Sequence, residues 1–369
     1  MKNDIIISGI QQMGVGVSSV EEAWKWYREY FGFEVIVFDE WADAEFMLPY
    51  TGGTPKSRHA CLALNLQGGG GFEIWQHTSF EPRRPAFDVV PGDLGIYSCK
   101  IKCKDAVSYH KTLKDKGQRV SDEVYTDATG RKYFYVRDPW DNLFQMVQPT
   151  EQQAGWMFNE NLPTGGVYGA VVGSHDADAA KNFYDKMLGY DVVLSDQTGT
   201  FDDLAHLGAP NVQFRRIVLA HSQPKKGPFG RLLGPSEIEI IQALDRPTPA
   251  RRIFEDRMWG ELGFIQICYD IRNMDGLREF CKEQGWNFTV DSMAYKNDFN
   301  MGEAGGDFAY NEDPSGSLIE YVQTNKLTIM KKLGIALNLK KRNPEKSLPT
   351  WILWCLRFLK RKELPPHVN

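Results

Sequence analysis

The strongest constraint on the fold of this chain is an internal repeat. Residues 23–35 recur as residues 180–192, with the same order of alanine, an aromatic–tyrosine pair, glycine, an aromatic residue, an acid and valine. Gly32 and Gly189 stand at the same place in the two copies, where a helix would end. The residue after a helix often adopts a left-handed backbone, which glycine reaches without a Cβ penalty. Each copy therefore predicts an amphipathic helix that ends at the glycine and leads into a strand.

Further matching segments extend the repeat over most of the chain. The matching pairs are 138–148 with 313–323, 92–96 with 260–264, and 72–76 with 238–242. The first pair begins with Asp-Pro in both copies, which is typical of a turn that feeds a strand. In order, the chain reads as four modules, each with an opening strand, a helix and three further strands.

This order of motifs resembles the vicinal oxygen chelate superfamily, which includes glyoxalases, bleomycin-resistance proteins and extradiol dioxygenases. The resemblance covers about residues 8–324. It implies an α+β fold in which four βαβββ modules pair into two half-open barrel-like cups. We expect the first two modules to form one domain and the last two a second, followed by a basic amphipathic helical tail. The expected bounds are 1–150 for the first domain, 151–164 for a linker, 165–325 for the second domain and 326–369 for the tail.

The resemblance also implies a divalent metal at the base of a cup, held by the first and last strands of each module. In the first half these positions fall on Gln12, Glu73, Ile96 (or Gly95) and Gln145. In the second half they fall on Tyr168 or Gly169, Glu239, Gly263 or Phe264, and Glu320. Such ligands leave coordination positions at which a substrate oxygen can be polarised. The expected metal ligands are therefore Gln12, Glu73 and Gln145 in one cup, and Glu239 and Glu320 in the other.

Several reactions fit such a site. We expect Glu73 and Glu320 to be catalytic, with His77 as a candidate base because period-two alternation places it on the strand face of Glu73. None of the seven histidines falls on an opening-strand position. Extradiol-type chemistry, which would use two histidines and a glutamate, is therefore disfavoured. The expected ion is Fe, Mn, Zn, Ni or Co, and its identity is left open.

Two classes of function remain open from the sequence. One is a metal-assisted lyase, isomerase or dioxygenase that acts on a lipophilic or aromatic oxygenated small molecule. The other is a metal-free protein that sequesters such a ligand, as bleomycin-resistance proteins do. Aromatic residues are frequent near both expected cups, which favours an apolar or aromatic ligand. The segment 220–236, rich in Gly, Pro and Lys, is expected to cover the second cup.

Charge is distributed unevenly along the chain. From residue 326 onward there are 11 basic and two acidic residues, a net charge of +9, which leaves −14 for the first 325 residues of a chain that carries −5. An acidic body disfavours nucleic acid as a partner. The apolar run 351–359 is too short to span a bilayer, which takes about 20 residues. The tail is therefore expected to pack on the body or on a second subunit in a homodimer, or to lie on an anionic membrane surface.

The chain begins without the charged and apolar regions of a signal peptide, so we expect a cytoplasmic protein, peripheral at the inner membrane surface if the tail docks there. Six scattered cysteines contain no CxxC pair. They predict neither a disulfide framework nor a structural zinc site.

Overall fold

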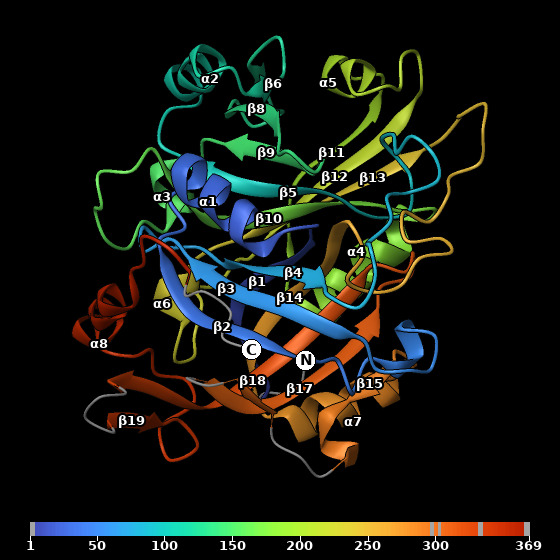
Figure 1. Cartoon of the computed structure of the whole chain (residues 1–369). Coiled ribbons are helices and arrows are strands. Elements are labelled where there is room, and N and C mark those ends of the chain that lie inside the picture. The colour runs from blue at the N-terminus through green and yellow to red at the C-terminus, as the bar shows by residue number, and fades with distance from the viewer. Residues whose placement is uncertain (1–3, 296–298, 302–303, 331–334, 365–369) are drawn as a thin grey trace.

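The computed structural model describes residues 4–295, 299–301, 304–330 and 335–364. All four expected modules are present, and the α+β fold is confirmed (Figure 1). The first module contains β1 (Ile6–Gly16), α1 (Val20–Phe31), β2 (Val35–Asp43), the 3-10 turn η1 (Leu48–Tyr50), β3 (Ser57–Leu64) and β4 (Gly71–His77). The second contains β5 (Gly95–Cys103), α2 (Ala106–Asp115), β6 (Arg119–Val120), β7 (Tyr125–Thr126), β8 (Lys132–Arg137) and β9 (Leu143–Val147).

The second half repeats this order after the short helix α3 (Glu151–Ala154). The third module contains β10 (Thr164–Gly173), α4 (Ala177–Leu188), β11 (Val192–Gly199), α5 (Asp202–His206), β12 (Phe214–Ala220), α6 (Gly230–Leu233) and β13 (Glu237–Ala243). The fourth contains β14 (Gly263–Arg272), α7 (Met274–Gln284), β15 (Val290–Asp291), the 3-10 turn η2 (Ser292–Tyr295), β16 (Phe299–Met301), β17 (Ala304–Glu312) and β18 (Leu318–Met330).

The repeated helices begin and end as the sequence predicts. α1 starts at Ser19, whose hydroxyl accepts a hydrogen bond from the backbone N–H of Glu22, and it ends at Gly32 with φ 68°. α4 ends in the same way at Gly189, with φ 72°. Both glycines adopt the left-handed conformation that terminates a helix, so this local prediction is confirmed.

A hydrogen bond joins the two repeated motifs. The hydroxyl of Tyr27 on α1 donates to Asp138 Oδ2 at 2.6 Å, and that of Tyr184 on α4 donates to Asp313 Oδ2 at 2.9 Å. Each aspartate also accepts from two backbone N–H groups of its own turn. The helix of one module is thereby tied to the closing turn of the next, and these buried polar groups are satisfied.

The sheets pair different modules from those we expected. β1 pairs antiparallel with β14, so the first and fourth modules share one sheet. β5 pairs antiparallel with β10, so the second and third share the other. Figure 1 shows the two sheets one above the other, each built from distant parts of the chain. We call the first–fourth pair the outer cup and the second–third pair the inner cup.

The expected pairing was wrong because the two contacts between opening strands, here called seams, resemble each other. Gly16 lies opposite Gly263 in the outer cup, and Gly173 lies opposite Gly95 in the inner cup. Opening strands with the same glycine at the same place can pair in either combination. The resemblance between modules therefore establishes that cups form without establishing which modules form them.

The C-terminal tail differs from the expected helix over its first part. β18 continues to Met330, and β19 (Ile335–Asn338) pairs with it as an added strand. The helix α8 (Thr350–Trp354) and the 3-10 helix η4 (Cys355–Leu359) follow. Within the described residues, no helix is long and apolar enough to cross a membrane.

Candidate functional site

Four side chains occupy equivalent positions around the base of the outer cup. On β4, Glu73 lies opposite Gly14 of β1, and Gln12 stands two residues before that partner. On β18, Glu320 lies opposite Cys268 of β14, and Gln266 stands two residues before it. The two halves of the cup thus present the same glutamine–glutamate pair, related by the internal repeat.

Direct hydrogen bonds connect these four side chains. Gln12 Nε2 donates to Glu73 Oε2 at 2.8 Å, and Gln266 Nε2 donates to the same oxygen at 3.0 Å. Gln266 Nε2 also lies 3.4 Å from Glu320 Oε2. The indole N–H of Trp259 donates to Gln266 Oε1 at 3.2 Å and orients that amide. The register of the strands therefore brings all four side chains to one point.

The pKa values of both carboxylates at this point are raised. Burial, followed by repulsion from Glu320, raises the pKa of Glu73 from 4.5 to about 8. Burial likewise raises the pKa of Glu320. In addition, Gln12 Oε1 is buried without a hydrogen-bond partner. Two crowded acids and an unpaired amide oxygen are the groups that a bound cation would stabilise.

The cavity above this base is large and mainly apolar. Its volume is about 590 Å³. One wall comes from β2 and β3, and another from β18 with Val322 and Leu327. Phe229 and Leu232, next to and within α6, also line the cavity, as does Leu356 of η4. The segment 220–236 therefore covers the outer cup, which corrects the expectation that it covers the cup of the last two modules.

Arg58 contributes the cation of the cavity lining. Its side chain is only 8% exposed and forms an ion pair with Glu40 at 2.7 Å. The guanidinium also lies over the ring of Trp75, 5.0 Å from its centroid. Because Glu40 already neutralises this charge, the wall near Arg58 remains suited to an uncharged, lipophilic ligand.

Three of the expected site residues come together and two do not. Gln12, Glu73 and Glu320 meet in the outer cup, whereas Gln145 and Glu239 lie in the inner cup. The expected sets Gln12–Glu73–Gln145 and Glu239–Glu320 are therefore both split, because the modules pair differently.

The fourth member of the outer site, Gln266, was missed. The sequence prediction had placed this position at Gly263 or Phe264, but β14 and β1 have a register shift between Gly14 and Val15. The shift adds a residue to β14 and moves the inward position to Gln266. A polar glutamine inside the apolar run Phe264–Ile271 was the available signal.

His77, the candidate base, does not face the outer cavity. Its Nε2 lies 2.9 Å from the carbonyl oxygen of Trp259, its ring packs against Phe80, and it is 2% exposed. It is not part of the cavity lining, and burial lowers its pKa. The side chain instead connects β4 to the segment that carries Trp259.

The inner cup lacks the equivalent set of four polar side chains. The same four register positions hold Gly169, Glu239, Ser98 and Gln145. Glycine offers no ligand, and the hydroxyl of Ser98 donates to the carbonyl oxygen of Leu143. Tyr168 and Ile96, the other residues considered at these positions, are also buried. Glu239 and Gln145 therefore have no opening-strand partner for a metal.

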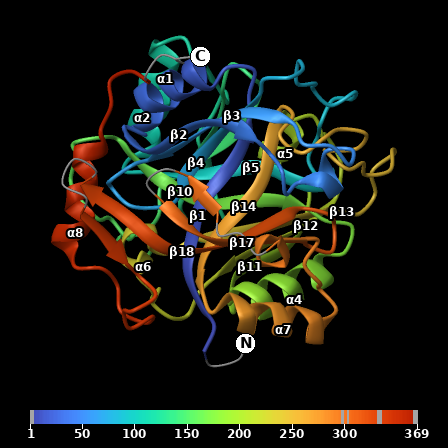
Figure 2. The same ribbon diagram turned by 60° about the horizontal axis from the view of Figure 1, so that its bottom comes forward.

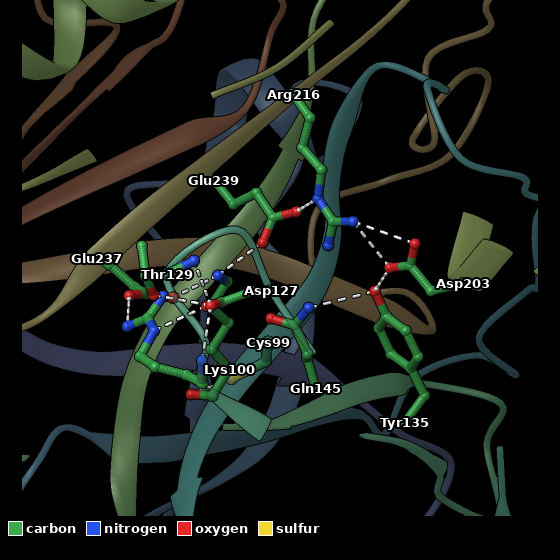
Figure 3. Close-up of polar contacts among 11 residues, drawn as sticks. Cys99, Lys100, Asp127, Thr129, Tyr135, Gln145, Asp203, Arg216, Glu237 and Glu239 are labelled. Atoms are coloured by element: carbon green, nitrogen blue, oxygen red, sulfur yellow. Dashed lines mark hydrogen bonds and ion pairs between the residues drawn. The ribbon is translucent and has the colours of Figure 1, made fainter. Parts of the chain in front are cut away.

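Side-chain cations take the place of an ion in the inner cup (Figure 3). Lys100 Nζ lies 2.7 Å from Glu239 Oε2, and Arg216 forms an ion pair with the other oxygen of Glu239. Arg131 pairs with Glu237 at 2.7 Å. Burial alone would raise the pKa of Glu239, but Arg216 and Lys100 outweigh it and lower the pKa to about 2. The 320 Å³ inner cavity is thus internally neutralised.

Among the described residues, no group of three His, Cys, Asp or Glu side chains is placed to hold a metal ion. The outer site combines two carboxylates with two glutamine amides.

Comparison with known families agrees with this architecture. The model of the glyoxalase/bleomycin resistance protein/dioxygenase superfamily matches residues 9–146, and a second model of the same superfamily matches residues 170–310. The chain belongs to this superfamily. The expected resemblance is confirmed, and the two matches cover both halves of the repeat.

Solved structures with the same fold include glyoxalase I from Zea mays, which is 12% identical with a TM-score of 0.52 and covers 85% of this chain and 92% of its own. A putative dioxygenase from Bacillus subtilis is 15% identical with a TM-score of 0.54 and covers 86% of each chain. The comparison with curated proteins gives no match. At these identities the likeness establishes only the fold of this chain. Its reaction has to be inferred from the site.

Proposed function

We propose that the outer cup is a divalent-metal-assisted active site for isomerase- or lyase-type proton transfer on a lipophilic carbonyl compound. The observation that supports it is the convergence of Gln12, Glu73, Gln266 and Glu320 beneath an apolar cavity. The inner cup, whose acids are neutralised by lysine and arginine, has a structural role in this proposal.

The residues of the outer cup fit a divalent cation. Both carboxylates lie beside Gln12, whose Oε1 is buried and unpartnered, while Gln266 Oε1 accepts from the indole of Trp259. An all-oxygen set suits hard ions, so Mn²⁺ ranks first among the ions expected from the sequence. A bound cation would polarise a substrate carbonyl and lower the pKa of a neighbouring C–H group.

The two carboxylates have different neighbours. Glu73 accepts hydrogen bonds from both amides, at 2.8 and 3.0 Å, whereas Glu320 interacts with Cys268, Tyr310 and, at 3.4 Å, Gln266. In the proposed reaction Glu73 stays fixed, and a Glu320 carboxylate oxygen takes a proton from the carbon next to the carbonyl. In an α-hydroxy carbonyl substrate Glu320 returns that proton to the former carbonyl carbon, while the hydroxyl proton passes to the former carbonyl oxygen, so the carbonyl group moves by one carbon. Its raised pKa suits a base that must also act as an acid.

The donor set favours proton transfer over oxygen chemistry. Non-haem iron oxygenases use two histidines and one carboxylate, and none of the four outer positions is histidine. The apolar walls formed by α6, η4 and β18 select a lipophilic body for the substrate and keep water from the reacting carbon.

Elemental mass spectrometry on protein purified without chelator tests this proposal. We expect about one divalent ion per chain, because the acids of the inner cup are already paired with lysine and arginine. The ion should be lost in Glu73→Ala and kept in Gln145→Ala, a control at the register position of the inner cup that corresponds to Glu320.

Two results would contradict the metal site. A Glu73→Ala variant that keeps its ion, with loss in Glu239→Ala, would move the site to the inner cup. Absence of metal even after reconstitution with Mn²⁺, Zn²⁺, Ni²⁺, Co²⁺ or Fe²⁺ would overturn the enzyme proposal in favour of ligand sequestration.

A further inference from the structure

The segment that closes the outer cavity has a second, exposed apolar face. Trp351, Trp354 and Phe358 on α8 and η4 are 66%, 43% and 60% exposed. They follow one another at intervals of three and four residues, which places them on one side of a helical segment. The rings of Trp354 and Phe358 are in contact, with centroids 5.8 Å apart. We call this group of exposed apolar side chains the aromatic face.

The opposite side of the same segment is buried in the protein. Ile352 and Leu353 are buried in the core beside the outer cavity, and Leu356 lines that cavity. Figures 1 and 2 both place α8 beside α6 at one end of the β18 sheet. Arg231 of α6 donates to Thr350 at 3.1 Å, which joins the two helices. The aromatic face is therefore the outer surface of a wall whose inner surface lines the outer cavity.

Basic residues surround the aromatic face in the chain. The described tail from 338 to 364 contains eight basic and two acidic residues. Arg357 and Lys360 anchor it to the body through ion pairs with Glu160. Arg361 and Lys362 are exposed, and neither has an ion pair within the described residues. Positive charge beside exposed tryptophan matches an anionic lipid interface, where indole rings and cations are both stabilised.

We propose that the aromatic face docks on an anionic phospholipid surface and admits a lipophilic substrate from the bilayer to the outer cavity. The docking depends only on the tail, while the delivery of substrate rests on the function proposed above. A symmetric dimer through the aromatic face would bring two positively charged tails together, and this repulsion favours an anionic lipid surface over a second copy of the chain.

Vesicle flotation of the full-length protein tests the docking. We expect binding to vesicles that contain phosphatidylglycerol, weaker binding to phosphatidylcholine alone, and loss of binding with added salt. The triple variant Trp351→Ser, Trp354→Ser, Phe358→Ser should bind about 10-fold more weakly. Leu244→Ser, which removes an exposed apolar side chain elsewhere on the surface, should bind like the parent protein.

A second readout separates folding from docking. The double variant Arg361→Glu, Lys362→Glu leaves the aromatic residues in place and should also lose binding to anionic vesicles. Equal binding by parent and both variants, or no binding by the parent, would overturn the proposal. A parent dimer that becomes monomeric in the triple variant, without vesicle binding, would show that the face binds a second copy instead. Because flotation is measured with metal-free and metal-loaded protein alike, its result is independent of the proposed activity.

Discussion

Glu73 and Glu239 occupy the same register position in the two cups but have opposite pKa shifts. Burial and Glu320 raise the pKa of Glu73 to about 8. At Glu239, Arg216 and Lys100 overcome the effect of burial and lower the pKa to about 2. The neighbours of the glutamate decide the direction of the shift: a second acid, Glu320, in the outer cup, and two cations in the inner cup.

The pH dependence of the free energy of unfolding should show the contribution of the ion pairs that Glu239 forms in the inner cup. The pKa of Glu239 is depressed from 4.5 to about 2, so its contribution is fully present above pH 4.5 and is lost as pH falls through 2. That shift corresponds to about 3 kcal/mol. In urea unfolding, Glu239→Gln should lose about this much at pH 7 and lose less further stability than the parent at pH 3. Glu255→Gln, at an exposed ion pair, is the control; equal pH dependence in parent and Glu239→Gln would contradict the assignment.

The sequence identified which side chains face into a cup where side-chain alternation was regular. Glu73 and Glu320 stand on closing strands without bulges against their parallel neighbours, and period two identifies their inward face. Gln266 was missed because the bulge near Gly14 shifts the inward position on β14. The cation partners of Glu239 could not be predicted, since Arg216 and Lys100 come from strands of two different modules.

At the scale of elements, the seams between opening strands require two backbone segments to lie very close together. A Cβ at Gly16 would lie 1.9 Å from the carbonyl oxygen of Glu261, and one at Gly173 would lie 1.7 Å from that of Asp93. In each seam the end of an opening strand presses on the loop that precedes its partner strand. Only glycine allows that contact.

Gly16→Ala should therefore destabilise the outer seam. Backbone atoms that approach closely can separate only by moving β14, so we expect a loss of about 2 kcal/mol or more in the free energy of unfolding. Gly199→Ala, at a position where a Cβ would meet no atom within 4 Å, should change stability by less than about 0.5 kcal/mol. Urea denaturation of both variants measures the difference. A neutral Gly16→Ala would show that the seam tolerates separation.

Local and long-range elements differ in how far the sequence determines them. The helix ends at Gly32 and Gly189 follow from residues within one turn, and they were predicted correctly. Residues 327–330 have an apolar pattern that was interpreted as part of an amphipathic helix. They form a strand because β18, which pairs with β17 as far as Leu327, continues beyond it and pairs with β19. Strand pairing, which the apolar pattern of one segment does not reveal, determined the outcome.

At the scale of the whole molecule, the chain closes on itself. The first module completes its cup with the last, while the second and third pair across the short connector between β9 and β10. Meanwhile Tyr27 binds Asp138 and Tyr184 binds Asp313, so adjacent modules are also joined through their helices. Every module therefore depends on both halves of the chain.

This arrangement predicts that neither half folds alone. Fragments 1–155 and 156–369 each contain one half of both cups, so each would expose the edges of β1 and β5, or of β10 and β14. We expect each isolated fragment to aggregate or to lack a cooperative unfolding transition, because exposed central strands lack their partners. Co-expression should yield a one-to-one complex with the circular dichroism of the intact chain. A monomeric 1–155 fragment that unfolds cooperatively would instead support a cup formed by the first and second modules, the arrangement that the sequence alone had favoured.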